Sequence, residues 1–333
     1  MHVTIVGAGT LGRVYGLRLA AIGEEVSFLV RRERAADLSP LVAEQVNGAH
    51  QRDLLERPDR VTTIPGRTRL VLVAVRFEQL APEPDPALVE ILRGGKSAPV
   101  VVLTPMLPTQ KRALDEALGR PTFAALPSVS GYIDDRGVAR YWAVKLTSTL
   151  IDEPAPDDRG IEQRIALEEL SRRLTRAGIG AHLERDVASV NAATTTTFFP
   201  LIAAINAGGG IDGALGDKAL LATVLEAAKE CTELGQEIGK AAPWAHLLTR
   251  FVGPYLKPGV ALGRRLFPEV IHFVDTHFGP KLHAQHLAMG EAILRLGEER
   301  GRAMPALAEL LERVRQAPPP PSAKAAPATP AAP

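Results

Sequence analysis

The sequence predicts an α/β domain with a doubly wound parallel sheet, then an all-helical domain, then a disordered tail. Strand-like and helix-like segments alternate up to about residue 184, and two of the strands are continuous apolar runs, as in a sheet buried on both faces. From Asp186 onward helical periodicity dominates, and after Gln316 the sequence is rich in proline and alanine. These patterns divide the chain into residues 1–184, 185–316 and 317–333.

The first strand ends in a glycine-rich loop. Val3-Thr4-Ile5-Val6 leads into a G-x-G-x-x-G motif whose residues are Gly7, Ala8, Gly9, Thr10, Leu11 and Gly12. Gly7 permits a tight turn, Gly9 lets a diphosphate approach the backbone, and Gly12 lets the following helix pack against the strand. The free N–H groups at the helix start favour an anion. A glycine-rich turn without a ligand is the alternative, but the strand before and the helix after favour a Rossmann-type dinucleotide site.

The end of the second strand indicates which cofactor is used. The strand at 25–30 runs directly into Arg31-Arg32-Glu33-Arg34. An arginine beside the ribose pairs with the 2′-phosphate of NADP, whereas an acidic residue binds the ribose hydroxyls of NAD. We therefore predict NADP with Arg31 as the phosphate ligand, while Glu33 leaves NAD open and Arg32 and Arg34 fit a solvated surface.

The remaining elements follow in order. In the first domain we expect strands at 61–64, 69–75, 98–104, 122–126 and 182–183. We expect helices from Arg32 to about Val46 and at 86–93, 109–118 and 161–177. Residues within 128–151 are expected to form an antiparallel extension at the edge of the sheet. In the second domain we expect helices at 186–206, 219–240, 281–301 and 305–316.

Composition limits the function classes. A net charge of +1 gives no general attraction to nucleic acid or membrane. The single Cys231 excludes an internal disulfide, and its helical context favours a buried apolar role. No signal peptide and no apolar stretch long enough to span a bilayer is expected. We expect a cytoplasmic protein that acts on a small molecule, and we include a homodimer among the expected assemblies.

The glycine loop, Arg31 at the second strand end, the edge extension and the helical second half together resemble the ketopantoate reductase (2-dehydropantoate 2-reductase) family, up to about Gln316. Val73-Ala74-Val75-Arg76 is similar in spacing to the segment that carries the family's strand-end lysine, so the resemblance adds Arg76 to the cofactor site. It also implies a second domain of the 6-phosphogluconate dehydrogenase C-terminal-like type. The implied activity is NADPH-dependent reduction of a 2-keto acid in the cleft between the domains.

The chain departs from the family's pattern at the positions that carry catalysis and substrate binding in that family. Where the family has Asn-Gly after the strand at 98–104, this chain has Thr104-Pro105, and Thr104 becomes a cofactor candidate. Aligning Pro200-Leu201 with the family's Asn-Pro-Leu places the catalytic lysine and two asparagines on Asn191, Thr195 and Phe199. The family's substrate-binding acid falls on Ala284. The lysine that protonates the alkoxide is therefore absent, and the Phe198-Phe199 pair favours a bulkier, less anionic substrate.

Other residues must then supply the acid. Asn191, with Thr194 and Thr195 on the same helical face, can bind a carbonyl but cannot supply a proton at neutral pH. Four of the eight histidines fall in the range from His272 to His286, so we take His272 and Asp275 as catalytic candidates beside Asn191 and Thr195. A metal site at the same histidines is a minor alternative. In the other alternative, the histidines are structural and bridge helices without a role in catalysis.

The sequence thus predicts an NADP-dependent oxidoreductase, similar to ketopantoate reductase, that reduces a carbonyl or imine whose identity the sequence does not give. One alternative is an NADP-binding sensor or partner protein without turnover. The other is an imine-reducing or opine-type dehydrogenase that uses the histidines as acids.

Overall fold

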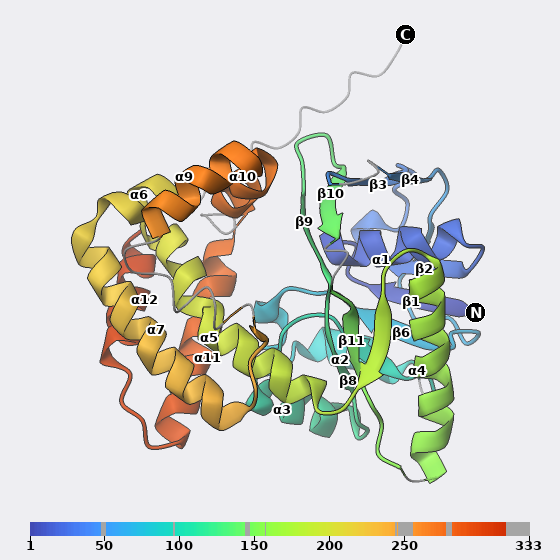
Figure 1. The fold of residues 1–333 in the computed structure, drawn as a ribbon. Coiled ribbons are helices and arrows are strands. Elements are labelled where there is room, and N and C mark those ends of the chain that lie inside the picture. The colour runs from blue at the N-terminus through green and yellow to red at the C-terminus, as the bar shows by residue number, and fades with distance from the viewer. Residues whose placement is uncertain are drawn as a thin grey trace.

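The computed structural model describes residues 1–47, 51–95, 97–143, 147–156, 158–243, 245, 256–277 and 282–317. The α/β part and the helical part of the chain lie side by side (Figure 1). The predicted tail at 317–333, apart from Ala317, falls outside the described residues. Residues 144–146 of the expected edge extension also fall outside them.

The larger sheet is the Rossmann-type sheet that the sequence predicts. Its strands are β1 (His2–Val6), β2 (Glu25–Leu29), β5 (Asp59–Val61), β6 (Leu70–Val73), β7 (Val100–Val102), β8 (Phe123–Leu126), β11 (Thr149–Asp152) and β12 (Ala181–Glu184), in the order β12-β11-β8-β7-β6-β1-β2-β5. All neighbours pair in parallel except β8 and β11. The chain leaves β1 for β2 on one side and returns to β6 on the other, which makes the β1–β6 boundary a topological switch point.

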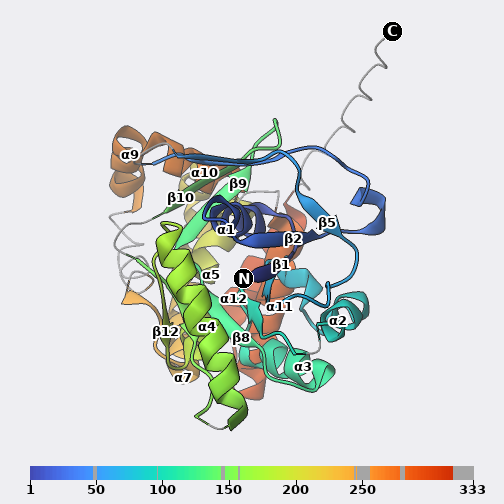
Figure 2. The ribbon, with the colours of Figure 1, turned by 90° about the vertical axis from the view of Figure 1, so that its right-hand side faces the viewer.

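Helices cover both faces of this sheet (Figure 2). They are α1 (Thr10–Ala21) and α4 (Asp158–Arg176) on one face, and α2 (Pro86–Arg93) and α3 (Pro108–Leu118) on the other. Strand β6 shows why both faces need cover: Leu70 and Leu72 pack into the core with α1 and α4, while Val71 and Val73 pack into the core with α2 and α3. The continuous apolar runs are therefore strands buried on both sides.

A second sheet lies over α1. Its strands are β3 (Leu41–Gln45), β4 (Arg52–Leu55), β9 (Val129–Ile133) and β10 (Ala139–Ala143), in the order β4-β3-β10-β9. All four contact α1, and Arg18 of that helix forms a buried ion pair with Asp53 of β4 at 3.6 Å. The expected antiparallel extension is therefore divided: β9 and β10 belong to a separate sheet that covers the first helix, whereas β11 pairs antiparallel with β8 and does extend the parallel sheet.

Two local predictions were wrong. The helix expected from Arg32 to Val46 is a 3-10 turn at Arg32–Arg34 followed by β3. Pro40 disfavours a continuous helix, and the alternating burial of Leu41 and Ala43 is that of a strand with one covered face. The strand expected at 61–64 is β5, which ends at Val61. The second 3-10 turn, Phe77–Gln79, follows β6.

The rest of the described chain is helical. The elements are α5 (Val187–Ala207), α6 (Ile211–Gly216), α7 (Lys218–Ile238), α9 (Leu256–Leu266), α10 (Pro268–His277), α11 (His283–Glu299) and α12 (Pro305–Gln316). Helices α5, α7, α11 and α12 enclose a core that contains the fully buried Cys231 and Phe199.

Helix α5 corrects the expectation about apolar stretches. By length and composition Val187–Ala207 could cross a membrane, although 56% of its most apolar window is buried inside the protein. Burial of this kind is what a core helix of a soluble protein shows.

Candidate functional site

The glycine loop has the geometry that anion binding requires. Gly7 has φ = 98°, and a Cβ on it would lie 2.5 Å from the carbonyl oxygen of Ala74. A Cβ on Gly12 would lie 2.0 Å from the carbonyl oxygen of Gly7. Gly9, at the start of α1, differs: a Cβ there would meet no atom within 4 Å beyond its neighbours, so it would project into open space. Gly7 and Gly12 are therefore required by the fold, whereas Gly9 leaves room outside the backbone where a diphosphate can approach.

The ends of β6 and β7 lie beside this loop. Ala74 follows β6 and donates its amide to the carbonyl of Val6 at 2.8 Å, which places Arg76 two residues further along the same edge. Thr104 follows β7, is 5% exposed, and donates its hydroxyl to the carbonyl of Val75 at 2.5 Å. The carboxyl ends of neighbouring parallel strands thus meet the helix start at the switch point, where open α/β sheets bind ligands.

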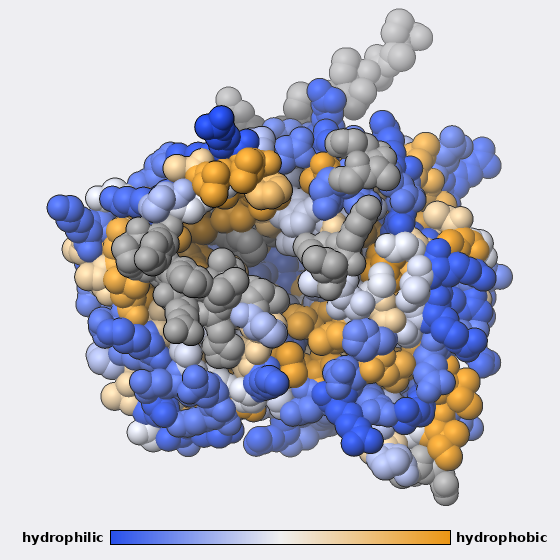
Figure 3. Space-filling view, viewed as in Figure 1, coloured by the Kyte–Doolittle hydropathy of each residue, from blue (hydrophilic) through white to orange (hydrophobic). Residues whose placement is uncertain are grey.

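A cavity of about 370 Å³ occupies this position. The residues that line it come from the glycine loop, the ends of β6 and β7, strand β9 and the start of α11: Gly9, Thr10, Leu11, Ala74, Val75, Arg76, Thr104, Pro105, Gly131, Tyr132, Ile133, Leu282 and Gln285. The face drawn in Figure 3 is hollowed between the helical part and the α/β part. We call this space the first cavity. Its walls come from both parts of the chain, because α11 contacts the 3-10 turn that follows Arg76.

Residues 3–92 match the sequence model of the family described as "Ketopantoate reductase PanE/ApbA". This stretch contains the glycine loop and the end of β6. No curated protein matches the chain in sequence.

Solved structures share the fold over nearly the whole chain. A PanE/ApbA family ketopantoate reductase from Ralstonia eutropha JMP134 superposes with a TM-score of 0.69 at 20% identity, covering 95% of this chain and 98% of its own. The dimeric ketopantoate reductase from Staphylococcus aureus gives 0.64 at 12% identity, with 95% and 98% covered. D-mandelate dehydrogenase, solved with NADH and anilino(oxo)acetate, gives 0.60 at 18% identity, with 95% and 97% covered. The fold of this chain is therefore that of ketopantoate reductases and related dehydrogenases.

Several arginines lie near the end of β2. Arg31 is exposed and directly follows Val30, whose amide bonds the carbonyl of Val61 at 2.9 Å. Burial, and after it the positive charges of Arg34 and Arg60, lower the pKa of the half-buried Arg13. Glu33 is exposed in the same turn. Arg34 and Arg60 thus lie close enough to Arg13 to disfavour its charged form, and Arg60 is paired with Asp37 at 3.8 Å.

The structure brings together five of the nine cofactor candidates. Gly9, Thr10, Leu11, Arg76 and Thr104 line the first cavity. Gly7, Ala8 and Gly12 shape the loop beneath it, and Arg31 lies outside its walls. Arg76 is exposed and pairs with Glu78 at 3.0 Å, so its guanidinium remains accessible from solvent.

The catalytic candidates are not among the residues that line the first cavity. Asn191 is 1% exposed and donates its amide to the carbonyl of Ala125 on β8 at 3.1 Å. Thr195 is half-buried on α5. His272 is exposed on α10. The Asp275 carboxylate accepts the amide of Ile211 at 2.6 Å and thereby caps the start of α6.

The histidine-rich stretch bridges helices in its described part. His286 of α11 is fully buried, and its Nδ1 accepts from the side-chain amide of Asn206 at 2.8 Å. Nδ1 of His283 lies 3.2 Å from Oδ1 of the same Asn206 on α5. Among the described residues no three His, Cys, Asp or Glu side chains gather as a metal site. These two histidines therefore hold the start of α11, and with it Leu282 and Gln285, against α5.

Sequence reasoning missed two polar side chains that line the first cavity, Tyr132 and Gln285. Tyr132 lies on β9, and burial raises the pKa of its hydroxyl. It is held at the cavity because β9 belongs to the second sheet, which the sequence placed at the edge of the first. The aromatic residues Tyr132 and Trp142 in a predicted hairpin were the available signal.

Proposed function

We propose that the protein is an NADP-dependent oxidoreductase that reduces the carbonyl, or the corresponding imine, of a small molecule. One observation carries the proposal: the open space over Gly9, the ends of β6 and β7, and the first turn of α11 line one cavity. The amides of the first turn of α1 have no partners within the helix and are available to a diphosphate. Arg31, with the guanidinium groups around Arg13, supports NADP over NAD.

Tyr132 is the group that we propose as the acid, in place of the four candidates taken from the sequence. When bound, NADPH supplies a hydride to the carbonyl carbon. The Tyr132 hydroxyl donates its proton to the carbonyl oxygen, which forms the alcohol, and the tyrosinate recovers a proton from water. Burial keeps this hydroxyl protonated at neutral pH, because it raises the pKa. Thr104 is less suited, since its hydroxyl already donates to Val75.

The localisation and the oligomeric state of the protein form part of the same proposal. We place it in the cytoplasm as a homodimer, and the dimeric ketopantoate reductase of the same fold supports the second point. The D-mandelate dehydrogenase of the same fold was solved with NADH, so NADH belongs in every assay as the competing cofactor.

Two measurements test the function. The first titrates NADPH and NADH by cofactor fluorescence, and the proposal expects tighter binding of NADPH. The second follows NADPH oxidation at saturating cofactor against 2-keto acids, aldehydes, ketones and imines. Turnover of a carbonyl supports a reductase, and turnover of imines alone supports an imine-reducing enzyme. Binding without turnover of any member supports the sensor or partner protein, which the buried, backbone-bound Asn191 favours. Absence of NADPH and NADH binding contradicts the proposal.

A further inference from the structure

A second cavity, of about 500 Å³, is lined in part by residues of the β9–β10 hairpin, the hairpin that carries Tyr132. Its described lining residues are apolar or carry hydroxyl groups, and none is charged: Leu126, Pro127, Ser128, Val129, Ser130, Trp142, Thr147, Ser148, Leu150 and Ala242. A space of this size and polarity fits an uncharged organic group. The first cavity, by contrast, includes Arg76.

The strand register shows that the two cavities adjoin. Tyr132 pairs with Arg140 across the hairpin, and Ser130 pairs with Trp142. Side chains two residues apart on a strand share a face and lie about 7 Å apart. Tyr132, Ser130 and Trp142 therefore belong to one face of the hairpin, with Tyr132 at the first cavity and the other two at the second.

The aromatic ring of Phe273 from α10 covers the junction. Its centroid lies 4.0 Å from that of Trp142, with the rings at 88°, and 5.8 Å from that of Tyr132. Phe273 is 2% exposed and Trp142 is 9% exposed. The edge-to-face packing fixes the Trp142 ring as a wall of the second cavity.

Helix α5 lies behind the far end of the second cavity. Asn191 bonds the carbonyl of Ala125, next to the lining residue Leu126. The hydroxyl of Thr194 accepts the amide of Ala242, which also lines the cavity. Asn191, which was expected to be catalytic, and Thr194 thus support the walls of the second cavity.

We propose that the second cavity binds an uncharged, apolar group of the substrate, about the size of a phenyl ring, while the carbonyl of the same molecule occupies the first cavity beside Tyr132. This inference rests on the proposed function and specifies its substrate class. A ring in contact with Trp142 removes apolar surface from water on both partners, which favours aryl or branched carbonyl compounds over small ones.

The test uses two uncharged methyl ketones, acetophenone and acetone, that differ in the group that would enter the second cavity. Binding of each to the protein saturated with NADP⁺ is measured by ligand-observed NMR. Ser130→Phe fills the cavity from β9, and Ser130→Leu serves if the larger change prevents folding. The matched control is Ser97→Phe, because Ser97 is exposed in a turn at the opposite end of the sheet.

The expected result is acetophenone binding at least about tenfold tighter than acetone binding, and a loss of at least about tenfold in Ser130→Phe but not in Ser97→Phe. NADPH affinity is unchanged in both variants. Equal affinity for the two ketones, or acetophenone binding that neither Ser130 variant weakens, overturns the inference. NADPH titration reports separately on the proposed function: if NADPH does not bind but acetophenone binding depends on Ser130, the cofactor proposal fails and the apolar site stands.

Discussion

At the scale of single residues, the three glycines of the loop have different roles although the motif presents them as equals. Gly7 needs a positive φ, Gly12 has no room for a side chain, and Gly9 has open space in front of it. Fold and cofactor binding can therefore be separated by substitution within one motif.

Gly9→Val is expected to abolish NADPH binding with the fold retained, because the side chain would occupy the space of the diphosphate. Gly12→Val is the contrast: its Cβ meets the carbonyl of Gly7, so a lower Tm is expected. Thermal unfolding and fluorescence titration check both variants. An unchanged NADPH Kd in folded Gly9→Val contradicts the prediction.

Arg31→Ala is expected to weaken NADPH by about 1.5–3 kcal/mol, the range for a lost charge-assisted hydrogen bond, and NADH much less. Arg32→Ala, an equally exposed neighbour, is the control and should change NADPH binding less. Titration of both cofactors measures the difference. Equal losses for NADPH and NADH would make Arg31 a surface charge only.

Tyr132→Phe is expected to lower kcat by about 100-fold for any carbonyl that the protein turns over, with NADPH affinity unchanged, because proton donation is lost. The pH profile adds a second readout. An acid must be protonated to act, and the pKa of Tyr132 is raised above its ordinary value of 10. The rate of the native protein should therefore stay level from pH 7 to 9 and fall only as pH rises through that pKa. An unchanged kcat in Tyr132→Phe would mean that another group donates the proton.

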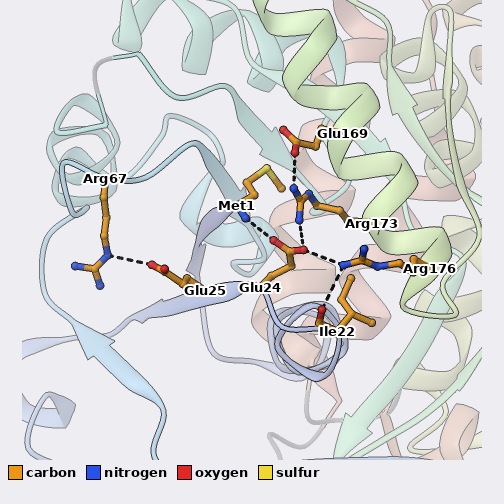
Figure 4. A network of polar contacts seen from close by, with 8 residues as sticks. All are labelled: Met1, Ile22, Glu24, Glu25, Arg67, Glu169, Arg173 and Arg176. Carbon is orange, nitrogen blue, oxygen red and sulfur yellow. Dashed lines mark hydrogen bonds and ion pairs between the residues drawn. The ribbon is translucent and has the colours of Figure 1, made fainter.

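At the scale of elements, α4 is attached to the start of β2 by one buried carboxylate. Glu24 is 8% exposed and forms ion pairs with Arg173 and Arg176 of α4 and with the amino group of Met1 (Figure 4). Burial alone raises the pKa of Glu24, but hydrogen bonds from Met1 and Arg173 outweigh it and the net pKa is lowered. This carboxylate therefore stabilises the folded state only while it is ionised.

Glu24→Gln is expected to lower the free energy of unfolding at pH 7 by about 3 kcal/mol, since it leaves the buried amino group of Met1 without its counter-charge. A depressed pKa contributes stability above the unfolded value, 4.5 here, and loses it as pH falls through the folded pKa. The difference from the native protein should therefore shrink below pH 4.5 in denaturant titrations. Glu25→Gln is the control: that side chain is 73% exposed, pairs only with exposed Arg67 at 3.7 Å among the ion pairs described, and should cost less than about 1 kcal/mol.

Elements with strong periodicity were predictable from sequence, and weakly patterned ones were not. The helix expected at 305–316 is α12 with the same bounds, because Pro305 starts it and four apolar residues repeat at helical spacing. Strand β3 was missed because its alternation covers only five residues, and because one of its two partners, β10, lies almost one hundred residues further along the chain. Its other partner, β4, is close in sequence but is itself only four residues long.

The glycine motif located the loop, and the family resemblance pointed to Arg76 and Thr104, which the structure places among the residues that line the first cavity. Phe199 shows the limit: placed by resemblance at the substrate, it is fully buried in the helical core, so it gives no information about substrate size. Trp142, which does line a cavity, reaches it only through the second sheet.

At the scale of the whole molecule, the fold is that of ketopantoate reductases, and the prediction of altered chemistry can be tested. The protein is expected to bind NADPH but to reduce ketopantoate at a negligible rate. Asn191→Lys should not restore the reaction, because the ammonium would replace an amide that is 1% exposed and would be buried without a counter-charge. A lower Tm for this variant and no gain in NADPH oxidation with ketopantoate are expected. Efficient reduction of ketopantoate by the native protein would falsify this reading of α5.

The enclosure of α1 between two sheets has a consequence for the thermodynamics of cofactor binding. Val14, Tyr15 and Leu19 are completely buried, and Arg13 joins the glycine loop to the hairpin turn through the carbonyls of Ala8 and Gly137. The amides that we propose to bind the diphosphate are thus held in place by packing and hydrogen bonds before any ligand arrives, and association need not offset the entropy of freezing a loop. Calorimetry should show this preorganisation as a small heat-capacity change on NADPH binding, limited to the surface that the cofactor itself covers.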